Sequence, residues 1–225
     1  MQSITRTEQE NRYSAVTFRH LLDSLARPGK INTLEYPRFL GEPPSYTSPV
    51  TSTPMPFNVY ALAAMMTLLD KEVTFAIAAN GVWLAQQDAV VQWITVRSGA
   101  STAPPETAAF VLFCDGTSNG SLSQLHVGTL AEPEMSATAF YSVEQINSTS
   151  GTLSSEERRN GWIRLELVGP GIKDVRTLQV AGLERAELQH IVNARQGYPL
   201  GVDVYLIDAL GHCIGLPRTT SIKGY

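Results

Sequence analysis

The sequence has few cysteines and lacks any long hydrophobic run. Cys114 and Cys213 are its two cysteines in 225 residues, and both stand in apolar, strand-like segments. A thiol in such a setting is usually a small buried hydrophobe rather than a reactive or paired group. No apolar run approaches the roughly 20 residues that a membrane helix needs, and the polar first residues lack the apolar core of a secretory signal. We therefore expect a cytoplasmic protein with no membrane partner.

An excess of charge of one sign is also missing. The net charge is −4, the isoelectric point is about 5.6, and acidic and basic residues are interspersed along the chain. A surface that follows nucleic-acid phosphates needs clustered lysine and arginine, so we expect no nucleic-acid partner. A hydrophobic content of 43% and a charged content of 17% are typical of a globular protein.

Lysine is scarce, and each of the four lysines lies in or beside a predicted turn: Lys30, Lys71, Lys173 and Lys223. A lysine that forms a Schiff base is normally buried, which depresses its pKa, so the pattern disfavours a pyridoxal-phosphate enzyme. The patterns G-x-x-x-x-G-K-[ST], G-x-S-x-G and H-E-x-x-H are absent, and the four histidines are scattered. We expect no cofactor and no metal, and the catalytic residues stay unknown.

Hydrophobic periodicity predicts helices that alternate with strands. The first helix is predicted within 14–29 from apolar residues at helical spacing, Phe18, Leu21, Leu22 and Leu25. Further helices are predicted over 57–69, 86–99 (with Asp88 as its N-cap) and 184–197, and strands over 30–36, 73–79, 108–115, 137–146, 162–172 and 178–183. Segment 40–56, rich in Pro, Ser and Thr, is predicted to be a mobile surface loop, and 148–161 is rich in turn residues. Apolar strands separated by helices indicate a single α/β domain over 1–225 with a mixed sheet.

The stretch from Tyr198 to Thr220 predicts a hairpin with strands over 202–208 and 212–216. A left-handed Gly211 would place Asp208 opposite His212, and the same register puts Arg218 opposite position 202, next to Asp203. A carboxylate inside an apolar strand needs a partner, which favours an ion pair between Asp203 and Arg218.

A second interpretation of this stretch is an anion site. Arg218, Thr219 and Thr220 supply a planar guanidinium and two hydroxyl groups, which suit a phosphate or phosphonate group. Ion pairing and ligand capture can coexist.

Two other features have alternative interpretations. The glycines of 169–172, "GPGI", either form a tight turn or bring backbone N–H groups to an anion, and we favour the turn. Arg19 borders the apolar face of the first helix, where it either stays in solvent or reaches a site or a partner subunit.

Four segments in this order and spacing resemble one family: "FRHLLDSLARPG" (18–29), "GPGI" (169–172), "YPLGVD" (198–203) and "LPRTT" (216–220). "LLDKEVTF" (68–75) fits the same pattern. The sequence is similar to the H subunit of the bacterial phosphonate carbon–phosphorus lyase system, the PhnH family. The resemblance implies a three-layer α/β domain like the large domain of pyridoxal-phosphate-dependent transferases, without the cofactor. Segment 40–56 looks longer than is usual in the family.

The resemblance also implies a function. Family members act with the G, I and L subunits to displace adenine from ATP with a phosphonate, giving a ribose 1-phosphonate 5-triphosphate, and a separate radical subunit later breaks the C–P bond. They form homodimers and enter a larger complex with the G, I and J subunits; the apolar content of this chain also favours a homodimer. We expect an assembly and substrate-handling subunit with little or no activity alone. The alternatives are a self-sufficient small-molecule enzyme with an anion cleft at Arg218 and Asp203, and a scaffold that touches no ligand.

Overall fold

An eight-stranded mixed sheet is the central feature of the computed structural model, which describes residues 6–148 and 153–223. The strand order is β1-β13-β12-β8-β7-β4-β5, with β6 paired to β4. Four neighbouring strands are parallel: β4 (Thr74–Ala79), β7 (Phe110–Phe113), β8 (Thr138–Val143) and β12 (Asp203–Asp208). The others are β1 (Asn32–Thr33), β5 (Val82–Trp83), β6 (Ser101–Thr102) and β13 (His212–Leu216). The predicted α/β class and mixed sheet are therefore confirmed.

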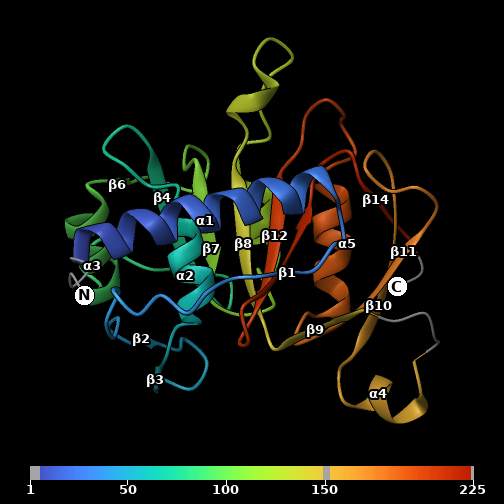
Figure 1. Ribbon diagram of the computed structural model, residues 1–225, viewed down its shortest axis with the longest axis horizontal. Coiled ribbons are helices and arrows are strands. Elements are labelled where there is room, and N and C mark those ends of the chain that lie inside the picture. Colours follow the sequence, from blue (N-terminus) through green and yellow to red (C-terminus); the bar gives the residue numbers. More distant parts are fainter. Residues whose placement is uncertain (1–5, 149–152, 224–225) are drawn as a thin grey trace, which may run out of the picture.

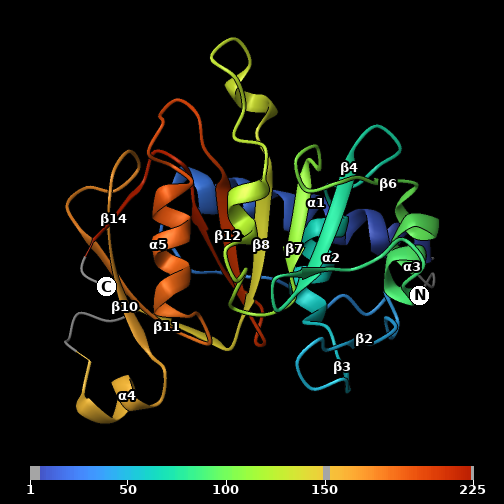
Figure 2. The same ribbon diagram turned by 180° about the vertical axis from the view of Figure 1, so that it is seen from behind.

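Helices lie on both faces of this sheet (Figures 1 and 2). α1 (Arg6–Ala26) and α2 (Val59–Met66) cover one face, α5 (Arg185–Asn193) covers the other, and α3 (Ala89–Ser98) lies toward one end. Successive side chains of β12 point to opposite faces of the sheet and contribute to two hydrophobic cores. Leu206 packs in the core that contains α5, whereas Tyr205 packs in the core that contains α1 and α2. No helix in the described part of the chain is long and apolar enough to cross a membrane.

A smaller antiparallel sheet packs on the α5 side, in the order β14-β10-β11-β9. Its strands are β9 (Gln145–Ser148), β10 (Ile163–Val168), β11 (Arg176–Ala181) and β14 (Ser221–Lys223). The remaining elements are β2 (Tyr46–Thr47), β3 (Pro54–Met55), α4 (Ser155–Arg159) and the 3-10 turns η1 (Ser121–Gln124) and η2 (Pro133–Met135). Part of the predicted turn-rich segment, 149–152, lies outside the described residues.

The buried face of α1 differs from the prediction. The helix already begins at Arg6, and Phe18 and Leu22, expected on its core-facing side, are 45% and 52% exposed. Leu21 is buried as predicted, together with Tyr13, Thr17 and Ser24. At Ser24 the helix backbone approaches β13 closely, because a Cβ added to Gly215 would lie only 2.5 Å from the Ser24 carbonyl. The inner face of α1 is therefore rotated relative to the predicted one, and it retains only part of the predicted residues.

Other boundaries are shorter than periodicity predicted. α2 begins only after Asn58, whose side chain accepts hydrogen bonds from two helix amides. Asp88 occupies the N-cap position of α3, but its carboxylate accepts from the Ala85 amide instead of from the helix. α5 ends at Asn193, and the predicted strand 30–36 contracts to β1. Within segment 40–56, β2 and β3 pair and Tyr46 is buried edge-on against Phe57.

The predicted strand 137–146 is two strands in different sheets. β8 ends at Val143 and β9 begins at Gln145. Between them, the Glu144 amide would lie 2.7 Å from a Cβ added to Gly182. The chain therefore changes sheet at a point where only a glycine neighbour fits. The apolar Ile146 of β9 lies only three residues after Val143 of β8, and for that reason the sequence predicted one strand.

The predicted hairpin and its register are confirmed. β12 and β13 pair Val204 with Leu216 and Ile207 with Cys213. The same register, extended by one residue, places Asp208 opposite His212 as predicted. Gly211 has the expected left-handed backbone, with φ of +85°. Cys114 and Cys213 are buried free thiols, as predicted.

Candidate functional site

Segments 18–29, 169–172, 198–203 and 216–220, distant in sequence, meet at one end of the structure. A Cβ on Gly171 would overlap the carbonyl oxygen of Ala26, at the end of α1, and one on Gly169 would lie 2.9 Å from the Thr219 carbonyl. Gly171 has φ of +81°, a conformation that favours glycine. These contacts support the tight-turn interpretation of 169–172, because other backbone fills the space beside the glycines.

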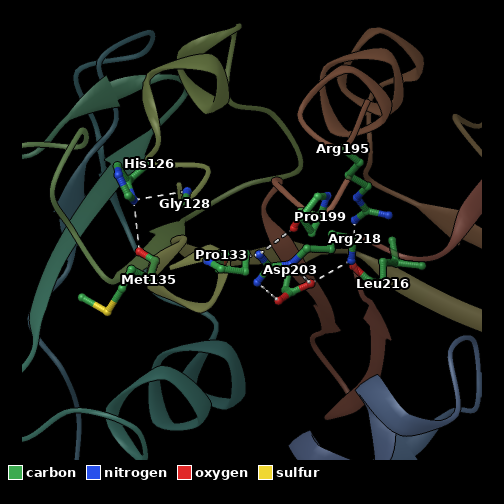
Figure 3. Close-up of polar contacts among 9 residues, drawn as sticks. All are labelled: His126, Gly128, Pro133, Met135, Arg195, Pro199, Asp203, Leu216 and Arg218. Atoms are coloured by element: carbon green, nitrogen blue, oxygen red, sulfur yellow. Dashed lines mark hydrogen bonds and ion pairs between the residues drawn. The ribbon is translucent and has the colours of Figure 1, made fainter. Parts of the chain in front are cut away.

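Arg218 and Asp203 complete this convergence (Figure 3). Arg218 Nη2 lies 2.7 Å from Asp203 Oδ2, and Nε lies 3.3 Å from Oδ1. The backbone amide of Arg218 also donates to Oδ1, at 2.7 Å. The two side chains are only 15% and 18% exposed. This pair therefore combines a two-point ion pair with a backbone hydrogen bond.

The third nitrogen of the Arg218 guanidinium is also engaged. Nη1 donates to the carbonyl oxygens of Pro133 at 2.6 Å and Pro199 at 3.5 Å (Figure 3). One side chain thus joins the turn after β13, the segment before β12 and the segment before β8. All three guanidinium nitrogens have protein partners, so the geometry favours a structural role for Arg218 over direct ligand binding.

The other predicted site residues separate into two groups. Thr220 is 3% exposed, and its Oγ1 is buried with no hydrogen-bond partner among the described residues, whereas the neighbouring Thr219 is exposed. Arg19 is exposed on α1, which covers the sheet face opposite α5 (Figures 1 and 2). The structure therefore brings Thr220 to the Arg218 region and leaves Arg19 on another surface.

Arg195 is a buried cation that sequence reasoning missed. It follows α5, is 7% exposed, and donates from Nη2 to the Leu216 carbonyl at 2.8 Å (Figure 3). Its Nε and Nη1 are buried and have no hydrogen-bond partner in the described part of the chain. Burial lowers its pKa to about 10, although the nearby Asp203 carboxylate acts in the opposite direction. Because cations are common at helix C-termini, no sequence signal distinguished this arginine.

A cavity of about 280 Å³ lies beside Arg195. Its lining residues are Val192, Arg195, Gln196, Arg218, Thr220, Ser221, Ile222 and Lys223. Three of them are cations and none is an acid, although the chain carries a net charge of −4. We call this the Arg195 cavity. Its lining offers hydrogen-bond donors and positive charge but no histidine, cysteine or carboxylate, so it is suited to binding an anion rather than to acid–base catalysis.

A larger cavity, of about 530 Å³, lies where β4, β7, β8 and β11 end. Asn80, Asp115, Glu144 and Gly182 follow these strands directly or closely and line it, together with Trp162. The Asp115 carboxylate accepts from the Asn80 amide at 2.8 Å, and burial raises its pKa. Ligands of open α/β sheets commonly bind outside the carboxyl ends of strands, so this is a second candidate site. Arginine and acidic side chains are mixed in its lining, which indicates no single ligand charge.

The histidines gather around no metal site in the described residues, where no group of three metal-ligating side chains occurs. Nδ1 of His126 lies 3.1 Å from the Met135 carbonyl oxygen and 3.3 Å from the Gly128 amide (Figure 3). His212 Nδ1 lies 2.9 Å from the buried Asp208 carboxylate. Both side chains thus hold neighbouring loops in place.

Comparison with known proteins identifies a family and a curated relative. Residues 6–223 match the protein family described as bacterial phosphonate metabolism protein (PhnH). Over 129 residues, the chain is 33% identical to the putative C-P lyase subunit protein HtxG of Stutzerimonas stutzeri. That match covers 56% of this chain and 57% of HtxG, so it spans little more than half the length of the relative.

Proposed function

Because this chain belongs to the PhnH family of bacterial phosphonate metabolism proteins, we propose that it is a subunit of a carbon–phosphorus lyase system. Its match to HtxG, which is named as a putative C-P lyase subunit, supports this assignment. The other subunits of such a system are its expected partners. By the family resemblance, these are the G, I, J and L subunits.

The proposed role is assembly and substrate handling, with little or no activity of the isolated chain. The reaction served is displacement of adenine from ATP by a phosphonate, which forms a ribose 1-phosphonate 5-triphosphate. The observation that carries the role is the engagement of Arg218, because Asp203, Pro133 and Pro199 occupy its three guanidinium nitrogens. The alternative of a self-sufficient enzyme built on an open Arg218 cleft is therefore less well supported.

The finer architecture is part of the same proposal. We place the chain with the three-layer large domains of pyridoxal-phosphate-dependent transferases, without the cofactor. None of the lysines in the described residues is buried, which supports this view because a Schiff-base lysine is normally buried. We also propose that the isolated chain is a homodimer. Light scattering that found only a 24.5 kDa species at micromolar concentration would contradict the dimer.

The proposed function is tested by reconstitution. The purified chain is incubated with ATP and methylphosphonate, first alone and then with the G, I and L subunits, and adenine release is measured. We expect release only from the reconstituted mixture. Adenine release by the chain alone would establish the self-sufficient enzyme instead.

Assembly is tested in cells. A tagged copy of the chain, expressed under phosphate starvation, should co-purify with the other lyase subunits. Recovery of the tagged chain without any of them would contradict an assembly role, whatever the reconstitution shows.

A further inference from the structure

We propose that the Arg195 cavity is a binding site for a tetrahedral oxyanion, namely a phosphate or phosphonate group. This site belongs to the chain itself and goes beyond its role in assembly. Two buried side chains that each have polar atoms without partners, the balance of charge and the size of the cavity carry the argument.

The first observation is the unpaired charge of Arg195. A buried guanidinium is stable when acceptors satisfy its donors, and removal from water without such acceptors is unfavourable. Here Nη2 has the Leu216 carbonyl, whereas Nε and Nη1 have no partner among the described residues. Asp203 is close enough to act on Arg195 electrostatically, but its oxygens are engaged by Arg218. An anion in the adjoining cavity would supply the missing negative charge.

The second observation is independent of the first. Thr220 comes from the C-terminal turn rather than from the end of α5, and it lines the same cavity. Its Oγ1 is buried without a partner in the described structure, although a threonine hydroxyl can donate one hydrogen bond and accept others. Two elements thus each contribute to the lining of one cavity a side chain that has an unsatisfied donor.

Arg218 forms a wall of the cavity rather than its principal ligand. Its charge is balanced by Asp203, and its three nitrogens have partners. Positive charge available to a ligand therefore comes from the buried Arg195 and from the exposed Lys223 of β14. Figure 3 shows Arg195 extending from the end of α5 toward Leu216, next to Arg218. A concave surface lined by one sign of charge concentrates ions of the opposite sign.

The volume limits the size of the ligand. Pockets for drug-sized molecules span about 300–1,000 Å³, and the Arg195 cavity, at about 280 Å³, lies just below that range. It can take a small oxyanion or the head group of a larger molecule. Inorganic phosphate, a phosphonate and the terminal phosphate of a nucleotide share the required chemistry.

The test measures binding by the isolated full-length chain at low salt. Isothermal titration calorimetry is performed with inorganic phosphate, methylphosphonate and ATP, and with acetate as a planar, singly charged control. We expect at least one of the three oxyanions to bind and acetate to bind at least about tenfold more weakly. Tightest binding of phosphate, methylphosphonate or ATP identifies the free ion, the phosphonate or the nucleotide as the ligand. Methylphosphonate as a probe rests on the proposed function, whereas inorganic phosphate does not.

Two variants locate the site. Thr220→Val keeps the side-chain shape and removes only the hydroxyl, and Arg195→Met removes the buried charge. Each should weaken oxyanion binding by about tenfold or more, since hydrogen bonds to charged groups are the strong ones. Arg159→Met, on the exposed end of α4, is the matched control and should bind like the unaltered chain. If Arg195→Met does not fold, Thr220→Val still decides the question.

The proposal is overturned if none of the three oxyanions binds, or if Thr220→Val binds them as well as the unaltered chain does. Neither result bears on the co-purification experiment. Conversely, the unaltered chain could fail to assemble with lyase subunits while Thr220→Val binds phosphate more weakly than the unaltered chain. That combination would contradict the proposed function and still support the anion site.

Discussion

Asp203 holds Arg218 by its backbone amide as well as by its guanidinium, with both the amide nitrogen and Nη2 at 2.7 Å from carboxylate oxygens. The carboxylate at the start of β12 therefore fixes both the position of the chain after β13 and the direction of the arginine side chain. The two side chains therefore contribute unequally to stability, because loss of the arginine side chain leaves the hydrogen bond from the backbone amide to Asp203 intact. Loss of the carboxylate removes all of these bonds.

The first prediction follows from this inequality. Asp203→Ala should destabilise the fold by about 3–5 kcal/mol, because it leaves a largely buried guanidinium and a backbone amide unpaired. Arg218→Ala should cost less, and the double variant should lose less than the sum of the two. Chemical denaturation of all four proteins measures the cycle. Additive losses would show that the two side chains do not stabilise each other.

The second prediction concerns the stability of Thr220→Val without ligand. Because Thr220 Oγ1 has no partner among the described residues, its replacement by a methyl group of similar size should change the free energy of unfolding by less than about 1 kcal/mol, or raise it. Added phosphate should raise the melting temperature of the unaltered chain more than that of the variant. A large loss of stability in the variant would mean that the hydroxyl has a structural partner.

The third prediction concerns the contact between α1 and β13. Gly215→Ala would place its Cβ 2.5 Å from the Ser24 backbone, so α1 must move away from the sheet. We expect a loss of more than about 2 kcal/mol, of the size seen for overpacked cores. Gly197→Ala is the control, since its Cβ would meet nothing closer than 3.7 Å. Equal stability of the two variants would contradict the close packing of α1.

The fourth prediction concerns the pH dependence of stability. Burial raises the pKa of the Cys213 thiol from 9.0 to about 12. The folded state therefore keeps the proton that the unfolded state releases, and the resulting stability is fully present below pH 9 and is lost as the pH rises toward 12. Between these values the unaltered chain should lose up to about 1.4 kcal/mol per pH unit from this group.

Cys213→Ala provides the comparison for this effect. Unfolding by denaturant at pH 8, 9.5 and 10.5 should show the stability difference between the unaltered chain and the variant shrinking as pH rises. A difference that stays constant across this range would mean that the thiol titrates alike in the folded and unfolded states. Native Cys213 should also react slowly with thiol reagents at pH 8, because the thiolate is the reactive form.

The sequence predicted best what depends on neighbouring residues. The register of β12 and β13 was predictable because a strand alternates with a period of two and Gly211 fixes the turn. The proximity of Asp203 to Arg218 followed from the same arithmetic. The segments from α1 and from the turn at 169–172 were singled out, but nothing in their local pattern showed that they would meet.

What depends on distant contacts was not predictable. Periodicity placed Leu21 on the inner face of α1 correctly but also pointed Phe18 and Leu22 inward, because it carries no information on the close approach of Ser24 to Gly215, which lies far along the chain. Arg195 has the sequence setting of an ordinary surface cation at a helix end, and only the fold shows it buried beneath the Leu216 carbonyl. The sequence therefore favoured the ion pair of Arg218 with Asp203 and named Arg218, Thr219 and Thr220 as the alternative anion site, whereas the unsatisfied donors belong to Thr220 and to Arg195, which the sequence did not single out.

The packing of α1 on β13 has a consequence for synthesis on the ribosome. α1 ends at Ala26, and β13, the strand on which it packs, begins only at His212. β12, which joins β8 to β13 within the main sheet, is also made late. Helices can form within microseconds, but contacts between remote segments must wait for both to leave the ribosome. The helix translated earliest among the described elements is thus one of the last to dock, and until then its inner face is available to a chaperone.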